Sequence, residues 1–306
     1  MKKWNVLVLM LLVFVMLNGC VPVSTMDKDA EGLRVLISSD IHYTDQVDYY
    51  VIDMKTRMQH WVDSFLAEYE ENPIDLLVIN GDLSLDYGSP AESILDTGVS
   101  TTKLFIDNYL SQLPEDLPVF IMPGNHELYS DEAWYELTGN HRQGHMVVDN
   151  TLFLFMDNYA EGLNPESDHI GIYTATDVDY INEMMSTYQE YDTYIIAHYI
   201  DPKAETQNFR KLLAENQRIK GLFSGHTHDS QNIELGEYWG NKTIAQTGHF
   251  SYYFSSSTEK PFWGFRELVI KPDEAYSQYI TVESDAIIAG KPEHFERTVT
   301  NLVQYK

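Results

Sequence analysis

Three continuous apolar segments, separated by stretches of helical pattern, constrain the fold of this chain more than any other feature. The apolar segments are residues 33–37, 75–79 and 118–122. Between them, residues 50–71 and 101–113 place apolar side chains at helical spacing. Continuous apolar strands alternating with helices are typical of parallel β-α-β units whose sheet is buried on both faces. The pattern therefore predicts an α/β first half.

Polar side chains follow each of the three apolar segments at the point where the segment ends. Asp40 and His42 follow the first, Asp82 follows the second, and Asn125 and His126 follow the third. Open α/β sheets bind their ligands beyond the carboxyl ends of parallel strands. We therefore expect these side chains to lie together at one edge of a sheet.

The second half of the chain is richer in predicted strands. Helical patterns cover 131–137, 178–191 and 205–216, and strand patterns cover 145–148, 151–156, 194–197, 222–223, 238–246, 264–270 and 279–282. The strand at 194–197 ends at His198, and the strand at 222–223 precedes His226 and His228. Residues 293–306 show at most a weak helical pattern.

The polar residues at the strand ends form a donor set suited to divalent cations. Carboxylate, amide oxygen and imidazole without a thiolate favour hard to borderline metal ions. The chain offers enough of these donors for two ions rather than one. Two metal ions about 3.5–4 Å apart can stabilise both the attacking and the leaving oxygen of a phosphoryl displacement. The donor set therefore predicts a dinuclear hydrolytic centre.

Taken in order, these short stretches resemble the five-part signature of the calcineurin-like metallophosphoesterase family. The motifs are Asp40-Ile41-His42, Gly81-Asp82, Gly124-Asn125-His126-Glu127, His198 and Gly225-His226-Thr227-His228. The resemblance covers residues 33 to about 250. It implies a four-layer α/β/β/α sandwich with two central sheets flanked by helices. It also implies two divalent or mixed-valence metal ions (Mn, Fe or Zn) as cofactors.

The resemblance assigns a role to each motif residue. Asp40, His42, Asp82 and His228 would hold the first metal, and Asp82 would bridge to a second metal held by Asn125, His198 and His226. A hydroxide bridging the metals would attack phosphorus in line. His126 would be the catalytic residue that stabilises or protonates the leaving oxygen. Glu127 would contact the residues that bind the metals. A glycine precedes each of Asp82, Asn125 and His226, which predicts turns with positive φ at these glycines.

The second motif departs from that of the protein Ser/Thr phosphatases, because Tyr87 stands where they carry arginine. Arginine is the natural bidentate partner of a phosphomonoester dianion, so its loss favours diesters. The net charge of −27 favours them too, and it argues against a nucleic-acid partner. We expect a phosphodiesterase acting on nucleotide derivatives, lipid head groups or wall polymers. The alternatives are a phosphomonoesterase or nucleotidase on the same site, or a non-catalytic metal-binding surface lipoprotein.

The N-terminus has the layout of a secretory signal. Two lysines precede an apolar run at 6–17 that is short for a membrane span. The run ends just before Cys20, the only cysteine of the chain. This arrangement resembles a bacterial lipoprotein signal, which implies lipidation of Cys20 and a membrane anchor outside the cytoplasm. An uncleaved N-terminal anchor is the alternative.

The same features divide the chain into three parts. Residues 1–19 are predicted to be the signal peptide, 20–32 a tether and 33–306 the phosphoesterase domain, with the assignment of 275–306 left open. Two further residues, Asp86 and His249, lie near the motifs in the sequence. Asp86 is predicted to be an ordinary loop residue. His249 follows a strand and either reaches the mouth of the site or is structural.

Overall fold

The computed structural model describes residues 32–44, 53–87, 99–163, 171–251, 263–282 and 298–305. The predicted signal peptide, Cys20 and all of the predicted tether except Gly32 lie outside the described residues. Among the described residues, no helix combines the length and the apolar character needed to cross a bilayer.

The first sheet contains the three apolar segments as parallel neighbours. Its strands are β1 (Leu33–Ser38), β2 (Leu76–Asn80), β3 (Val119–Met122), β12 (Gly264–Ile270), β13 (Ala275–Thr281) and β14 (Thr298–Tyr305), in the order β14-β13-β12-β1-β2-β3. β1 pairs with β2 and β2 with β3 in parallel, whereas β12 lies antiparallel to β1. The predicted β-α-β units are confirmed.

The second sheet holds the strands of the middle of the chain. Its strands are β4 (Gly144–Val148), β5 (Thr151–Met156), β8 (Asp192–Ala197), β9 (Ile219–Ser224), β10 (Asn232–Glu234) and β11 (Thr243–Gln246), in the order β10-β11-β9-β8-β5-β4. β5, β8 and β9 are parallel neighbours. A separate ribbon pairs β6 (Tyr159–Leu163) with β7 (Gly171–Tyr173).

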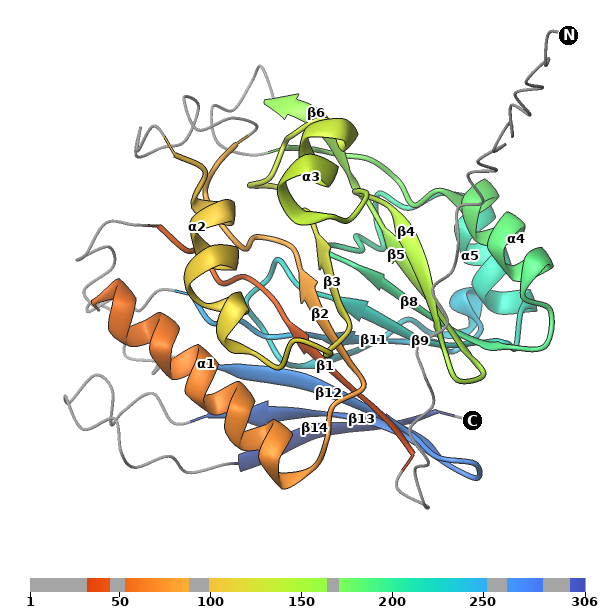
Figure 1. The fold of residues 1–306 in the computed structure, drawn as a ribbon. Helices are drawn as coiled ribbons and strands as arrows, with labels where there is room; N and C mark the ends of the chain where they lie inside the picture. The colour runs from red at the N-terminus through yellow and green to blue at the C-terminus, as the bar shows by residue number, and fades with distance from the viewer. Residues whose placement is uncertain are drawn as a thin grey trace, which may run out of the picture.

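Helices cover the outer faces of the two sheets (Figure 1). The helices are α1 (Met54–Glu71), α2 (Thr101–Asn108), α3 (Asp131–Thr138), α4 (Val178–Thr187) and α5 (Gln207–Glu215), with 3-10 turns η2 (Leu110–Gln112) and η3 (Glu237–Trp239). The first three pack with the first sheet, and α4 and α5 pack with the second. α1 begins at Met54, where the Asp53 side chain accepts a hydrogen bond from the Thr56 N–H and caps the helix, and residues 50–52 of the predicted pattern lie outside the described residues.

The continuous apolar strands are explained by burial on both faces. In β1, Leu36 packs under the helices while Val35 and Ile37 face the second sheet. β5 divides in the same way, with Leu154 toward α4 and α5 and Phe155 toward the first sheet. Alternate side chains of a strand point to opposite faces, so such a strand needs apolar residues at every position. The fold is the predicted α/β/β/α sandwich.

The C-terminal segment differs from its prediction. Residues 298–305 form β14, antiparallel to β13, rather than a weak helix. The ring of Tyr305 lies 5.6 Å from that of Tyr194, and its hydroxyl is 2.9 Å from Ser277 Oγ. These contacts with both sheets outweigh the ambiguous local pattern. The predicted strand at 238–246 is also shortened, because η3 occupies its start and β11 begins at Thr243.

Candidate metal centre

The carboxyl edges of the two sheets meet and bring the five motifs together. Nδ1 of His198, which follows β8, lies 2.9 Å from the carbonyl oxygen of Asn80 at the end of β2. The backbone N–H of His226, which follows β9, donates to Asp40 Oδ2 at 2.9 Å. Two contacts between loops of different sheets therefore join the motifs of the first half to those of the second.

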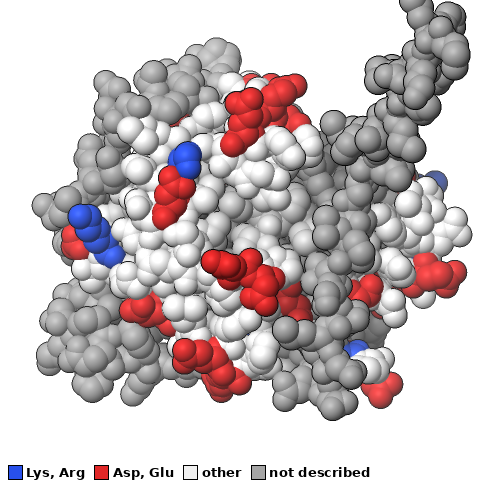
Figure 2. Space-filling model, in the orientation of Figure 1, with Lys and Arg blue, Asp and Glu red and all other residues white. Residues whose placement is uncertain are grey.

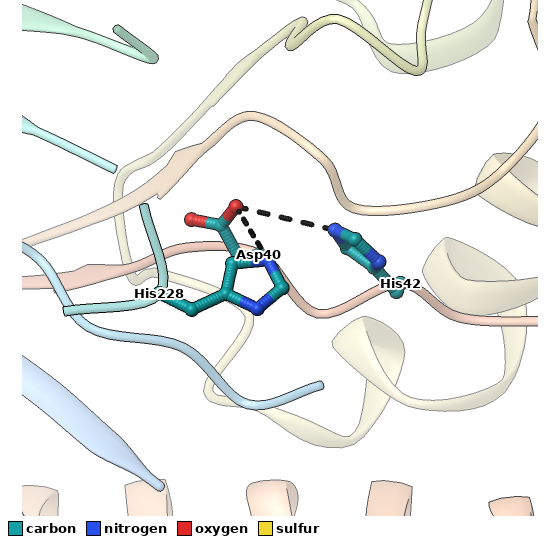
Figure 3. Close-up of side chains that lie close together, drawn as sticks. All are labelled: Asp40, His42 and His228. Atoms are coloured by element: carbon teal, nitrogen blue, oxygen red, sulfur yellow. Dashed lines mark ion pairs between the residues drawn. The ribbon is translucent and has the colours of Figure 1, made fainter. Parts of the chain in front are cut away.

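One group of donors consists of Asp40, His42 and His228, whose side chains face one another (Figure 3). Nε2 of His228 lies 3.3 Å from Asp40 Oδ1, and Nε2 of His42 lies 4.0 Å from the same oxygen. The Asp40 side chain is fully buried. This trio is one candidate metal site.

The carboxylate of Asp82 lies at the centre of the remaining donors. Its Oδ2 is 3.4 Å from His42 Nε2, 3.3 Å from His198 Nε2 and 3.7 Å from His126 Nε2. Asp82 belongs both to a group with His42 and His126 and to a group with His198 and His226. This shared position matches the bridging role that the resemblance implies.

Asn125 extends the second group. Its Oδ1 lies 2.7 Å from His226 Nδ1 and 3.2 Å from His198 Nε2. The seven predicted ligands and His126 therefore lie at one location. His126 is itself close enough to Asp82 and His42 to act as a donor, although the resemblance gives it a different role.

Buried donor atoms in this cluster fit divalent cations. Oδ1 of Asp40 is buried and accepts no hydrogen bond from the described residues. Nδ1 of His198 donates its proton to the Asn80 carbonyl, so Nε2 is the nitrogen that remains for a metal ion, and it lies 3.3 Å from Asp82 Oδ2 and 3.2 Å from Asn125 Oδ1. A metal-binding histidine typically has its second N–H anchored in this way.

The pKa shifts in this cluster indicate that its carboxylates are ionised and interact with positive charge. Burial alone would raise the pKa of Asp40, but His228 lowers it to about 2. Burial alone would lower the pKa of His198, but Asp82 and Asp40 raise it to about 10. The metal-free protein thus balances its buried carboxylates with protons, which metal ions would replace. Burial lowers the pKa of His226 to about 4, so this ligand is neutral.

The backbone of the site lies in the left-handed region at the ligands themselves. Positive φ values occur at Asp40, His42, Asp82, His226 and His228. Non-glycine residues adopt this region at a cost of about 1–3 kcal/mol each, and such strain concentrates at functional sites. The glycine prediction was therefore only partly right, since among the three motif glycines only Gly81 has a positive φ.

Gly124 and Gly225 are required for a different reason. A Cβ atom on Gly124 would collide with Asp82 Oδ1 and approach His198 Cδ2 to 2.9 Å. A Cβ atom on Gly225 would collide with Ser39 Oγ and lie 2.7 Å from Asp40 Oδ2. The glycines leave the space that the two carboxylates occupy.

Glu127 supports the site through the backbone. Its Oε2 accepts hydrogen bonds from the N–H groups of Asp82 (3.0 Å) and Gly124 (2.8 Å). Its Oε1 accepts from the N–H of Ser84 at 2.6 Å and lies 3.1 Å from the Ser84 hydroxyl. Burial and the charge of Asp82 raise the pKa of Glu127 to about 8. Glu127 therefore joins the loop after β2 to the loop after β3.

Arg142 joins the loop after β3 to the loop after β5, a role that the sequence does not reveal. It donates to both oxygens of Asp157 and to the carbonyl oxygens of Glu127, Tyr129 and Tyr159. These five bonds match the five N–H groups of a guanidinium. No motif marks Arg142, because three of its acceptors are backbone carbonyls that any residue could supply.

Other residues near the motifs have structural surroundings. Asp86 accepts hydrogen bonds from the N–H groups of Thr101 and Thr102 and thus caps α2. His249 is buried and stacks on His228 with ring centroids 5.1 Å apart, so it packs against a candidate metal ligand. A cavity of about 550 Å³ beside the centre is lined by Asp131, Asp157 and Tyr159 among others.

Fold and donor set together define an α/β/β/α protein with a metal-binding cluster at the joined edges of its sheets. A family model described as calcineurin-like phosphoesterase matches residues 33–230. The chain therefore belongs to the calcineurin-like phosphoesterase family.

The chain is similar to a curated protein and to several solved structures. The chain is 25% identical over 225 residues to a Bos taurus transmembrane protein with metallophosphoesterase domain. That match covers 70% of this chain but only 44% of the relative. Solved structures with a similar fold include Entamoeba histolytica Vps29 complexed with zinc, at 14% identity and a TM-score of 0.39 over 88% of this chain and 98% of that one. Another is GAP50, the anchor in the inner membrane complex of Plasmodium, at 12% identity and a TM-score of 0.48 over 89% and 90%.

Proposed function

We propose that the chain is a hydrolase that uses two divalent metal ions and prefers phosphodiesters. The observation that carries this proposal is the position of Asp82, whose Oδ2 lies 3.3–3.7 Å from three imidazoles that belong to two different donor groups. A carboxylate placed between two donor groups is the arrangement that a dinuclear site requires.

The proposed division of ligands uses the first and third of the three donor groups, because the family resemblance gives His126 of the remaining group a catalytic role. Asp40, His42, Asp82 and His228 would hold one ion, and Asp82, Asn125, His198 and His226 would hold the other. Bound ions would supply Lewis-acid stabilisation of the phosphoryl oxygens and a water of lowered pKa. The protein supplies the orientation, because buried hydrogen bonds hold His198 and Asp82 in place.

His126 is proposed as the catalytic residue. Its backbone N–H donates to Asp82 Oδ1 at 3.0 Å, which fixes the residue at the edge of the centre. Its ring packs edge-on against Tyr87 with centroids 5.1 Å apart. With 16% of its side chain exposed, the imidazole can contact a substrate, and because burial lowers the pKa of His126 the group it offers the leaving oxygen is the N–H of the neutral ring.

Preference for diesters is supported by the missing guanidinium. Tyr87, which the comparison of motifs sets against that arginine, is buried and packs against His126. Arg142 is close by, but its hydrogen bonds all go to protein acceptors. The face drawn in Figure 2 carries more acidic than basic side chains, which disfavours a second negative charge on the substrate.

The membrane anchor is proposed from the sequence of residues 1–20 alone. Lipidation of Cys20 would place the enzyme outside the cytoplasm, where nucleotide derivatives, lipid head groups and wall-polymer diesters are its candidate substrates. Replacement of Cys20 by Ala should abolish metabolic labelling with a fatty acid. Labelling that persists in this variant would refute the anchor without touching the hydrolase proposal.

The hydrolase is tested with purified protein that is stripped of metal and reloaded with Mn²⁺. We expect bis-(p-nitrophenyl) phosphate to be hydrolysed faster than p-nitrophenyl phosphate, and Asp82→Asn to abolish turnover. Asp86→Asn is the matched control, because Asp86 is also a buried carboxylate on this loop but caps α2. Equal rates on the two substrates would refute the diester preference. Two bound ions with no turnover across a broad phosphoester panel would indicate the non-catalytic alternative.

A further inference from the structure

The segment after β11 lies against one of the candidate metal ligands. The N–H of Phe250 donates to the carbonyl of Asp40 at 3.2 Å, and the indole N–H of Trp263 donates to the carbonyl of Ser251 at 3.0 Å. These bonds hold His249 and Ser251 beside His228. Both side chains are buried, and the proposed chemistry does not use either of them.

The contacts of Ser251 connect the two histidines. Its Oγ lies 3.1 Å from His249 Nδ1 and 3.4 Å from His228 Nδ1. The rings of His249 and His228 stack with an interplanar angle of 14°. A hydroxyl carries one proton and two lone pairs, so it can donate to one ring while accepting from the other.

The direction of these hydrogen bonds follows from a backbone group. The N–H of Ser251 donates to His249 Nδ1 at 3.3 Å, so this nitrogen carries a lone pair rather than a proton. The Ser251 hydroxyl can then donate to the same nitrogen and accept from the Nδ1–H of His228. In this tautomer Nε2 of His228, which lies 3.3 Å from Asp40 Oδ1, is the nitrogen that remains for a metal ion.

We propose that Ser251 and His249 are positioning residues that hold His228 in its metal-binding tautomer and orientation. The inference rests on the proposed function, since it concerns the site formed by Asp40, His42 and His228. Neither residue would touch a metal ion or the substrate. Partners of this kind change metal affinity by about 10- to 100-fold when they are removed.

The test measures metal binding and not turnover alone. Metal-free full-length protein is titrated with Mn²⁺ by calorimetry and with Co²⁺ by visible absorption, which reports the coordination geometry. We expect Ser251→Ala to weaken one of two binding events by about 10- to 100-fold and to leave the other unchanged. Ser251→Thr should restore the affinity, because it restores the hydroxyl.

Two further variants separate positioning from packing. His249→Phe keeps a flat ring on His228 but removes the nitrogen acceptor, so the same event should weaken and its Co²⁺ spectrum should change. Ser230→Ala is the matched control, because it removes a buried hydroxyl that accepts from Asn301 Nδ2 at 3.1 Å instead of contacting a ring. It should bind metal like the wild type.

The outcomes distinguish this inference from the hydrolase proposal. If the wild type binds two ions and Ser251→Ala binds both of them with unchanged affinity, the positioning role is refuted and the dinuclear site stands. Equal weakening in Ser251→Ala and Ser230→Ala would refute it as well, because the loss would then reflect packing. A wild type that binds no Mn²⁺ or Co²⁺ would refute the dinuclear site itself.

Discussion

Replacing Glu127 with Gln should destabilise the metal-free protein, because the hydrogen bonds of Glu127 are divided between its two oxygens. Oε2 accepts from the N–H groups of Asp82 and Gly124, and Oε1 accepts from the N–H of Ser84. A glutamine amide has only one acceptor oxygen. Its best orientation satisfies Asp82 and Gly124 and turns its NH₂ group toward the Ser84 N–H.

The magnitude follows from the one backbone donor that loses its acceptor. The Ser84 N–H can only donate, so it would face the new NH₂ group without an acceptor. A buried unsatisfied donor costs about 1–3 kcal/mol. We therefore expect the free energy of unfolding to fall by about 1–3 kcal/mol, which is a large part of the 5–15 kcal/mol typical of proteins.

Glu205 provides a matched control. It is also a buried glutamate, but its Oε1 accepts from the Tyr173 hydroxyl (2.7 Å), the Thr176 hydroxyl (2.6 Å) and the Thr176 N–H (3.2 Å), and its Oε2 only shares that same N–H at 3.2 Å. A glutamine oxygen at that position would keep all three bonds. Glu205→Gln should therefore cost less than Glu127→Gln in urea unfolding of the metal-free proteins at about pH 9, where a Glu127 carboxyl with a pKa of about 8 is ionised. Equal losses in the two variants, or a Glu127→Gln protein as stable as the wild type, would refute the reasoning.

Three other results are expected. Asn125→Ala should lower metal occupancy, whereas His126→Ala should keep both ions and lower kcat; loss of metal from His126→Ala in elemental analysis would make it a ligand. Gly124→Ala should abolish metal binding because its Cβ would collide with Asp82 Oδ1, while Gly139→Ala, with no atom within 4 Å of its Cβ, should cost only about 1 kcal/mol through its positive φ and bind metal normally. Metal in 100-fold excess over its Kd should stabilise the wild type by about 2.7 kcal/mol for each bound ion in urea unfolding; an unfolding midpoint that chelator leaves unchanged would contradict this.

Much of the architecture is predictable from local patterns. The apolar segments of β1, β2 and β3 are continuous because both faces of each strand are buried. A run of consecutive apolar residues in the sequence therefore predicts such a strand. The motifs follow the strands, so their meeting at one edge follows from parallel pairing. β14 is the exception, because its conformation depends on contacts that Tyr305 makes with both sheets.

The sequence by itself determined the family, the parallel strands and the donor types that gather at their ends, because each of these depends on residues close together in the chain. Only the tertiary structure decided how the donors are supported. Glu127 acts on backbone N–H groups more than 40 residues away, and the contact of His249 with His228 depends on where β11 places its following loop. Backbone groups are the same at every residue, so a side chain that binds them leaves no pattern in its partners. The support of the site therefore becomes visible only when the loops are placed in space.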